Sequence, residues 1–463
     1  MSQISRPALG LGLLLSLAFA SASLPLLALN PPVPEGPVVP VATTAPWSAP
    51  PAVAFLPGGD LLLAANSPAD ATACQQGLAP CAGGPLVGYA GDRFAPSAAT
   101  APFALEESLD QPATSQEIRL ANLPAAAGGG FVLAWENDQY CDPQSGLCTG
   151  GDGSGSGIAA RLFRSAQSPA GPSFQVNTTI AGDQAHPAVA ALPNGGFVIV
   201  WQGRIGDASA WDLYAQRFNA QAEPLGNELQ IPEGLTGDVA RSAVAAAADG
   251  SFLVAFRRLV DVAPALFVRH FAADGTPDAN DVEVDGGADG GLPSDPALTA
   301  LPGGGYAITW RSDLLSSPTA NIWVRRLDVT GLPSGDPVAA NLQAVDSPTA
   351  GIEPVLPDLA ADAAGGLLAV WPNHAAATAG GSMVPIHATY FGSPTDAPSR
   401  EILVAQVNFP LSPRVVSDGD HAYAVVWSRI TTSHGVASQL YEGRRSIVPG
   451  GTCTAGTAAL CLS

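Results

Sequence analysis

Six cysteines fall into three local pairs, and their spacing carries the most direct chemical signal in the chain. The pairs are Cys74 with Cys81, Cys141 with Cys148, and Cys453 with Cys461. An even number of cysteines at short spacings favours disulfides in an exported protein, each worth about 2.5 kcal/mol in the chain-entropy interpretation. Zinc is the alternative, but it favours C-x2-C spacings with nearby histidine, and neither is present. We therefore expect three disulfides.

A glycine-rich segment after the second cysteine pair contains two acidic residues that could bind calcium. Asp142 follows Cys141 directly, and Asp152 lies within GGDGSGSG at 150–157. Ca²⁺ takes about six to eight oxygen ligands from flexible loops. A complete acidic calcium loop alternates several Asp or Asn residues, whereas these two are ten positions apart. Calcium is therefore a weak candidate against a flexible Gly/Ser turn, and no other cofactor is expected.

No spacing of residues predicts a catalytic set. The six histidines are scattered without H-x-x-x-H or H-E-x-x-H spacing, and we find no G-x-S-x-G, phosphate-binding glycine loop or lone cysteine nucleophile. Arg161, Arg269 and Arg325 recur at one position of the repeat described below. A repeated position indicates a repeated structural contact, such as a hydrogen bond between neighbouring repeats, more readily than catalysis. We name no catalytic residue, and a non-catalytic protein is favoured over an enzyme.

The composition points to an all-β protein and excludes some partners. The 463 residues include 51 Gly and 43 Pro, and only 13% are charged, which is typical of short strands joined by turns. All 19 basic residues are Arg, and 40 acidic residues bring the net charge to −21. Such a field repels phosphate backbones, so no nucleic-acid partner is expected. The charge also serves solubility.

The N-terminal region has the pattern of a secretory signal. Residues 1–22 contain Arg6, an apolar run and small residues at a cleavage site, and a Pro-rich linker follows at 23–46. Residues 7–29 carry no charge and could span a bilayer if cleavage failed, so a membrane partner is expected only in that case. We expect an exported protein, located in the periplasm, at the cell surface or outside the cell.

Seven copies of one segment dominate the rest of the chain. The copies are LPGGDLLLAA (56–65), GGGFVLAW (128–135), LPNGGFVIVW (192–201), ADGSFLVAF (248–256), LPGGGYAITW (301–310), AAGGLLAVW (363–371) and GDHAYAVVW (419–427). Six of them end on an aromatic residue. Proline stands fourteen positions before the final residue in five copies, and a YAQRF-like segment follows each copy. The final residues of successive copies are 54 to 70 positions apart. A repeat with this period indicates stacked or radially arranged supersecondary units.

Each unit reads as four short antiparallel strands, with a second strand apolar enough to be covered on both faces. Seven such units predict a seven-bladed β-propeller of four-stranded blades over 47–449, with an open solenoid as the competing architecture. A strand within 38–44 or 446–448 is expected to close the ring. The tail 450–463 contains the third cysteine pair and is expected to staple that edge.

The GGFVVVW-like strand, Asp/Gly-rich loop and YAQRF-like strand resemble repeats of secreted and surface-attached bacterial proteins, often adjoining hemolysin-type calcium-binding or adhesin regions. The resemblance covers about residues 50 to 443. It implies a propeller and no activity, since that group has no common catalytic set. This chain differs in having no calcium-repeat array and no separate adhesin domain.

The connection between second and third strands is long in the first two units. It runs 29 and 28 residues there against 14 to 20 elsewhere, and both long loops carry a cysteine pair. Such loops would form a raised rim suited to binding, unless the disulfides merely restrain two insertions. The leading hypothesis is a non-catalytic exported propeller that binds an envelope or extracellular protein or glycan. The alternatives are an extracellular polysaccharide-active hydrolase or lyase, and a purely structural surface module. Asp, Glu and Arg converging at the central opening would favour the enzyme.

Overall fold

The fold is taken from a computed structural model. It describes residues 39–40, 52–56, 60–68, 83–92, 103–106, 117–137, 139–141, 148–204, 210–231, 239–260, 263–286, 290–314, 319–342, 345–346, 356–373, 383–392, 398, 401–408, 413–417, 419, 423–433 and 436–447. Within these ranges the only helix is one 3-10 turn, η1 (Ala125–Ala127), and no helix is long and apolar enough to cross a membrane. The described part of the chain is therefore almost entirely strand and loop.

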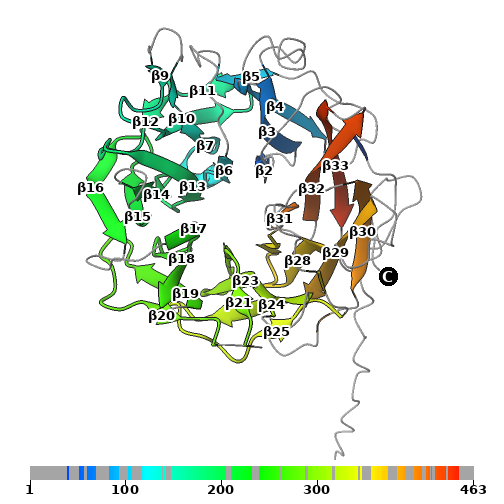
Figure 1. Cartoon of the computed structure of the whole chain (residues 1–463). Coiled ribbons are helices and arrows are strands. Elements are labelled where there is room, and N and C mark those ends of the chain that lie inside the picture. The colour runs from blue at the N-terminus through cyan, green and yellow to red at the C-terminus, as the bar shows by residue number, and fades with distance from the viewer. Residues whose placement is uncertain are drawn as a thin grey trace, which may run out of the picture.

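Seven sheets surround a central opening (Figure 1). The first contains β2 (Ala52–Phe55), β3 (Asp60–Pro68), β4 (Gly83–Asp92) and β5 (Phe103–Glu106). The second contains β6 (Ile118–Asn122), β7 (Phe131–Asn137), β10 (Gly157–Ser165), β11 (Ser168–Pro169) and β12 (Phe174–Gln175). The third contains β13 (Asp183–Ala191), β14 (Phe197–Arg204), β15 (Asp212–Phe218) and β16 (Pro224–Ile231). The fourth contains β17 (Val239–Ala246), β18 (Phe252–Val260), β19 (Ala263–Phe271) and β20 (Val282–Glu283).

The remaining sheets continue around the ring. The fifth contains β21 (Leu292–Pro293), β22 (Ala297–Ala300), β23 (Tyr306–Asp313), β24 (Thr319–Leu327), β25 (Val338–Ala339) and β26 (Val345–Asp346). The sixth contains β27 (Asp358–Ala361), β28 (Leu367–Pro372), β29 (Met383–Phe391) and β30 (Ile402–Asn408). The seventh contains β31 (Arg414–Ser417), β32 (Tyr423–Ser433), β33 (Val436–Ile447) and β1 (Val39–Pro40). A separate hairpin pairs β8 (Gln139–Cys141) with β9 (Cys148–Gly150).

The apolar repeat segments form the second strand of each sheet. In β14 the residues Phe197 to Trp201 have no exposed surface, because neighbouring sheets cover both faces. The described core consists of seven hydrophobic clusters, and each is formed by residues of two adjacent sheets. The last of them packs Val53 and Leu63 of the first sheet against Ala424 and Val426 of the seventh. Every pair of adjacent sheets around the ring, including the first and the seventh, therefore shares a buried hydrophobic cluster.

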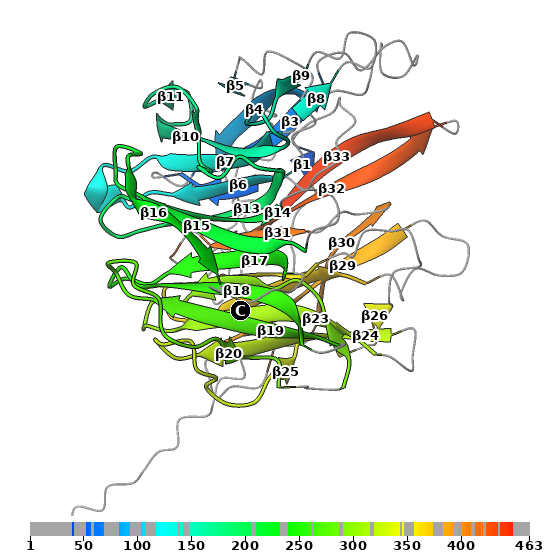
Figure 2. The same ribbon diagram turned by 60° about the vertical axis from the view of Figure 1, so that its left-hand side comes forward.

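Both ends of the chain contribute to the seventh sheet. Its outer strand is β1, which pairs antiparallel with β33 through Val39 and Arg444. The strand lies within 38–44, while 446–448 overlaps the end of β33. Figure 2 shows the long β32–β33 hairpin reaching outward beyond the neighbouring strands. The last sheet is thus held by backbone hydrogen bonds to a segment just over 400 residues earlier in the chain.

The prediction of an all-β propeller is confirmed, but the expected strand number needs a correction. Five of the seven sheets have four strands, whereas the second has five and the fifth has six. In the fifth sheet, β21 and β22 are separated by Ser294–Pro296, where Pro296 lacks the N–H that a continuous ladder requires. The outer strand is also split, so that β26 pairs with the start of β24 and β25 with its middle.

The Gly-rich turn of the repeat makes a sharp prediction about stability. Gly305 has φ +80°, and a Cβ there would lie 2.4 Å from the carbonyl oxygen of Leu327. Gly303 belongs to the same turn, and a Cβ added there would meet no atom within 4 Å. Gly305→Ala is expected to lower the free energy of unfolding by about 2 kcal/mol, and Gly303→Ala by about 0.5 kcal/mol or less, in urea denaturation. Equal losses would contradict this account of the turn.

Candidate functional site

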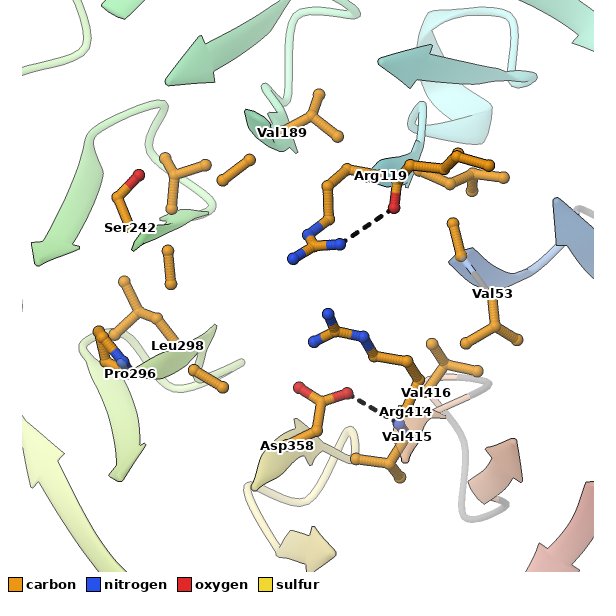
Figure 3. A pocket seen from close by; sticks show the side chains of 17 residues that line it. Val53, Arg119, Val189, Ser242, Pro296, Leu298, Asp358, Arg414, Val415 and Val416 are labelled. Carbon is orange, nitrogen blue, oxygen red and sulfur yellow. Dashed lines mark hydrogen bonds between the residues drawn. The ribbon is translucent and has the colours of Figure 1, made fainter. Parts of the chain in front are cut away.

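A cavity of about 180 Å³ occupies the centre of the ring. It is lined by the inner strand of all seven sheets, namely β2, β6, β13, β17, β22, β27 and β31. Figure 3 shows Arg119, Arg414 and Asp358 reaching into the cavity. Apolar side chains such as Pro296 and Leu298 face them, and Val53 lies on the same side as Arg414. The charges are therefore confined to one side of a cavity whose lining is otherwise largely apolar.

Strand register explains this division. In each sheet, one residue of the inner strand pairs with the next-to-last residue of the repeat segment, as Ala188 pairs with Val200. The residues at this inner position are Ala52, Arg119, Ala188, Ala243, Ala297, Asp358 and Arg414. All seven line the cavity. Alanine in four sheets leaves space, and the three charged residues come from the second, sixth and seventh sheets. One repeated position has thus been used partly for packing and partly for charge.

A second layer of polar residues begins two positions earlier in four consecutive sheets. Its members are Glu117, His186, Arg241 and Asp295. The Glu117 carboxylate lies 3.3 Å from Arg119 Nη2, 3.2 Å from Arg241 Nη1 and 3.5 Å from His186 Nδ1. Three sheets therefore meet at one carboxylate, which is nearly buried at 5% exposure.

Two further acids, Asp295 of this layer and Asp358 of the first position, have fewer partners. Asp295 Oδ1 lies 3.1 Å from Arg257 Nε, and Arg241 is its other nearby cation. Asp358 accepts a hydrogen bond of 2.9 Å from the backbone N–H of Val415, as drawn in Figure 3. Both carboxyls are thus held in place from a neighbouring sheet.

Burial and charge move the pKa values of these groups in opposite directions. Burial raises the pKa of Glu117, but Arg119, His186 and Arg241 outweigh it, so this pKa lies well below its ordinary value. Burial raises the pKa of Asp295 and of Asp358, because the nearby arginines offset the lost solvation only in part. Burial and the charge of Arg414 lower the pKa of Arg119 to about 10. Glu117 is therefore a fixed anion, whereas Asp295 and Asp358 hold a proton more readily.

His186 combines an unusual backbone with an acidic environment. Its φ is +55°, a left-handed conformation that costs a residue with a Cβ about 1 to 2 kcal/mol. Its N–H donates to Glu136 Oε2 at 3.2 Å, and its ring lies against Trp211 with centroids 6.5 Å apart. This backbone conformation places the imidazole Nδ1 beside Glu117. Such stored strain is most often found at functional sites.

The residues that the sequence singled out lie elsewhere or remain untested. Asp142 lies outside the described residues, as do Cys74, Cys81, Cys453 and Cys461. Cys141 and Cys148 stand opposite each other in the β8–β9 hairpin, and the disulfide between them stays a prediction.

The calcium candidate Asp152 already has protein partners. It accepts hydrogen bonds from the Ser154 N–H at 3.1 Å and from Asn177 Nδ2 at 2.7 Å, which fixes the turn before β10. Within the described ranges, no three His, Cys, Asp or Glu residues are grouped to hold a metal ion. Calcium binding by Asp142 and Asp152 stays a prediction that the described residues do not test.

The repeated arginine position has the structural role that the sequence indicated. Arg161 Nη1 donates to the Leu105 carbonyl at 2.8 Å, and Arg325 Nη1 donates to the Val284 carbonyl at 2.7 Å, in each case in the preceding sheet. Thr389, at the same position, donates to the carbonyl of Ala340 at 2.8 Å. Arg269 instead contacts Asp281 within its own sheet at 2.6 Å. The prediction of contacts between repeats is thus confirmed for three of these positions.

Sequence reasoning missed the cavity residues, although a signal was present. Thirteen positions before the repeat's final residue stand Ala52, Ala188, Ala243, Ala297, Asp358 and Arg414. Four of these six residues are alanine, so the charged residues Asp358 and Arg414 indicate a site. In the second unit the connection carrying η1 is longer, so Arg119 stands sixteen positions before Trp135 and falls out of that column.

Comparison with known proteins supports the fold. No protein-family model and no curated protein sequence matches this chain. The crystal structure of a polysaccharide lyase aligns with a TM-score of 0.50 at 9% identity, over 90% of this chain and 100% of the lyase. An α-L-arabinanase of Penicillium chrysogenum complexed with arabinobiose gives 0.46 at 12% identity, over 90% and 97%. A protein of unknown function from Dyadobacter fermentans gives 0.46 at 13%, over 72% and 94%. The likeness to the lyase, at 9% identity, concerns the fold alone.

Proposed function

We propose that this chain is an exported seven-bladed propeller that binds and cleaves an extracellular polysaccharide at its central cavity. The observation that carries the proposal is that Arg119, Asp358 and Arg414 line one cavity. A cluster of charged residues from neighbouring sheets joins this cavity through Arg119, namely Glu117, Arg241 and Asp295. Paired acids with different pKa values are the groups that glycoside cleavage requires. The lyase likeness supports only the scaffold, so the function rests on the site.

We assign each group a role from its position and charge. Glu117 orients the His186 imidazole through Nδ1, as a carboxylate does for a general base. Asp295 and Asp358, whose raised pKa values favour the protonated form, are the candidate general acids. Arg119 and Arg414 bind the substrate and favour negative charge that develops on it. A base and an acid serve in both hydrolysis and β-elimination. The two arginines suit β-elimination better, because the transition state of hydrolysis is oxocarbenium-like and gains positive charge. The reaction product decides between hydrolase and lyase.

A panel of extracellular polysaccharides tests the proposal with the mature protein. His186→Asn and Asp295→Asn are each expected to lower the cleavage rate about 100-fold, the usual contribution of a general acid or base. The matched control is His270→Asn, because His270 also faces a carboxylate, Asp278 at 3.2 Å, but in β19 away from the cavity. New reducing ends measure cleavage, and ultraviolet absorbance of an unsaturated sugar identifies a lyase.

Each outcome of this panel bears on the proposal. Polysaccharide binding without cleavage would replace it with the non-catalytic binding module that the sequence favoured. An equal loss in His270→Asn would refute the assigned roles.

Binding at a loop rim is the second candidate function. The β8–β9 hairpin pairs with none of the seven sheets and carries Cys141 opposite Cys148, as a stapled rim would require. The loop segments 69–82 and 142–147 lie outside the described residues. A calcium ion at Asp142 and Asp152 belongs to this candidate, and its partner would be an envelope or extracellular protein or glycan. Loss of binding on shortening 142–147, with cleavage intact, would support it.

Export and the disulfides make a prediction about mass. The protein recovered from the envelope or medium is expected to begin near residue 23 and to carry three disulfides, lowering its mass by two hydrogens for each. Intact-mass spectrometry before and after reduction measures both. A full-length chain in the membrane fraction would instead indicate a retained anchor.

A further inference from the structure

The cavity brings two guanidinium groups together, with Asp358 as the one acid that lines it among the described residues. Arg119 comes from β6 and Arg414 from β31, two strands separated around the ring by the first sheet. Figure 3 shows their guanidinium ends turned toward each other inside the cavity. Burying two like charges side by side is unfavourable unless a further group balances them.

The described protein groups satisfy this pair only in part. Arg119 donates to the carbonyl of Ile118 at 3.1 Å and lies 3.3 Å from Glu117, which Arg241 also contacts. Arg414 interacts electrostatically with Asp358 and makes no hydrogen bond or ion pair within 4 Å to a described residue. At least one guanidinium therefore has donors to offer a ligand. Guanidinium forks match the two oxygens of a carboxylate.

The opposite wall and the size of the cavity define the rest of the ligand. Val189, Pro296 and Leu298 present apolar surface to the same space, which suits the C–H face of a sugar ring. A volume of about 180 Å³ is below the roughly 300 to 1,000 Å³ of pockets for drug-sized molecules. It therefore fits one sugar unit, with the rest of a polymer outside.

The overall charge of the chain restricts where an acidic ligand can bind. The chain has a net charge of −21 and only 19 cationic residues. Two of these, Arg119 and Arg414, line the cavity. Arg241 and Arg257 contact the acids Glu117 and Asp295 of the adjoining cluster. An acidic surface repels polyanions at a distance, so an acidic ligand is bound only where arginines gather.

We propose that Arg119 and Arg414 bind the carboxylate of one uronic acid unit while the apolar wall contacts its ring. This inference rests on the proposed polysaccharide function and names its substrate class as uronate-containing chains. The partners are a carboxylate and two guanidinium groups, so the affinity should fall as salt rises.

Calorimetric titration of the full mature protein with small probes tests the site. Glucuronate is expected to bind about tenfold or more tightly than glucose or the neutral methyl ester of glucuronate, because a charge-assisted bidentate contact is lost in both. Arg414→Gln is expected to remove that preference, while Arg414→Lys retains part of it. The matched control, Arg164→Gln, changes an exposed arginine of β10 and should bind as the parent does.

The outcomes separate this inference from the function on which it rests. Equal binding of the methyl ester would overturn the carboxylate assignment, and inorganic sulfate binding as tightly as glucuronate would reduce the site to a general anion site. Cleavage of neutral polysaccharides with unchanged KM in Arg414→Gln would overturn the inference and leave the proposed function standing. Binding of glucuronate without cleavage of any polysaccharide would support the carboxylate assignment and overturn the proposed cleavage.

Discussion

Replacing Glu117 with Gln is expected to lower the free energy of unfolding at neutral pH by about 3 to 5 kcal/mol, the usual cost of breaking a buried ion pair. The carboxylate is only 6% exposed and lies within 3.5 Å of Arg119, Arg241 and His186. An amide of the same size keeps the packing but leaves two partly buried guanidinium groups without their counter-charge. Urea denaturation of both proteins measures the difference.

The matched comparison is Asp295→Asn, which makes the same chemical change in the same cluster. The pKa of Asp295 is raised because burial outweighs Arg257 and Arg241, so its ionised form destabilises the fold. Asp295→Asn is therefore expected to leave stability at neutral pH unchanged or higher. Large losses in both variants would mean that the cluster depends on packing and not on charge.

The pH dependence has a definite sign for each acid. The folded pKa of Glu117 is below its ordinary 4.5, so its contribution is fully present above about pH 4.5 and is lost as pH falls through the lower, folded value. The gap in stability between the parent and Glu117→Gln should narrow over that acidic range. For Asp295 the penalty begins as pH rises above the unfolded pKa, so the benefit of Asp295→Asn should disappear in acid.

The ring could be predicted from the sequence because its signal is repeated and local. The segment LPNGGFVIVW becomes a turn and then β14, with Leu192 and Gly196 joined by a 2.8 Å backbone hydrogen bond. Its apolar run is long enough to be buried on both faces, which only neighbouring sheets can achieve. The Arg161 and Arg325 contacts were predictable for the same reason, since repetition indicates structure.

The candidate site could not be predicted because it depends on how repeats differ. Arg119 and Arg414 are almost 300 positions apart and share one cavity only after the ring closes. No local pattern relates them. The longer connection with η1 also shifts the second unit against the others, so a fixed spacing from Trp135 misses Arg119. Split strands such as β25 and β26 are similarly invisible, because short outer strands carry few apolar residues.

The second large effect is expected from the tryptophans that end the repeat. Trp310 is 1% exposed and belongs to the cluster between the fourth and fifth sheets, with Leu253 and Val268. Trp310→Ala should lower the free energy of unfolding by about 3 to 5 kcal/mol, through lost apolar contact and the cavity left behind. Trp310→Phe should cost less, since the fourth unit already has Phe256 at this position.

The control lies directly across the strand. Trp323 of β24 pairs with Trp310 of β23, but it is only partly buried against the same cluster. The same substitution, Trp323→Ala, therefore removes as many atoms from the same sheet while creating a smaller cavity. We expect at most about half the loss seen for Trp310→Ala, measured by circular dichroism in urea. An equal loss would mean that packing within each sheet, and not between neighbouring sheets, holds the ring together.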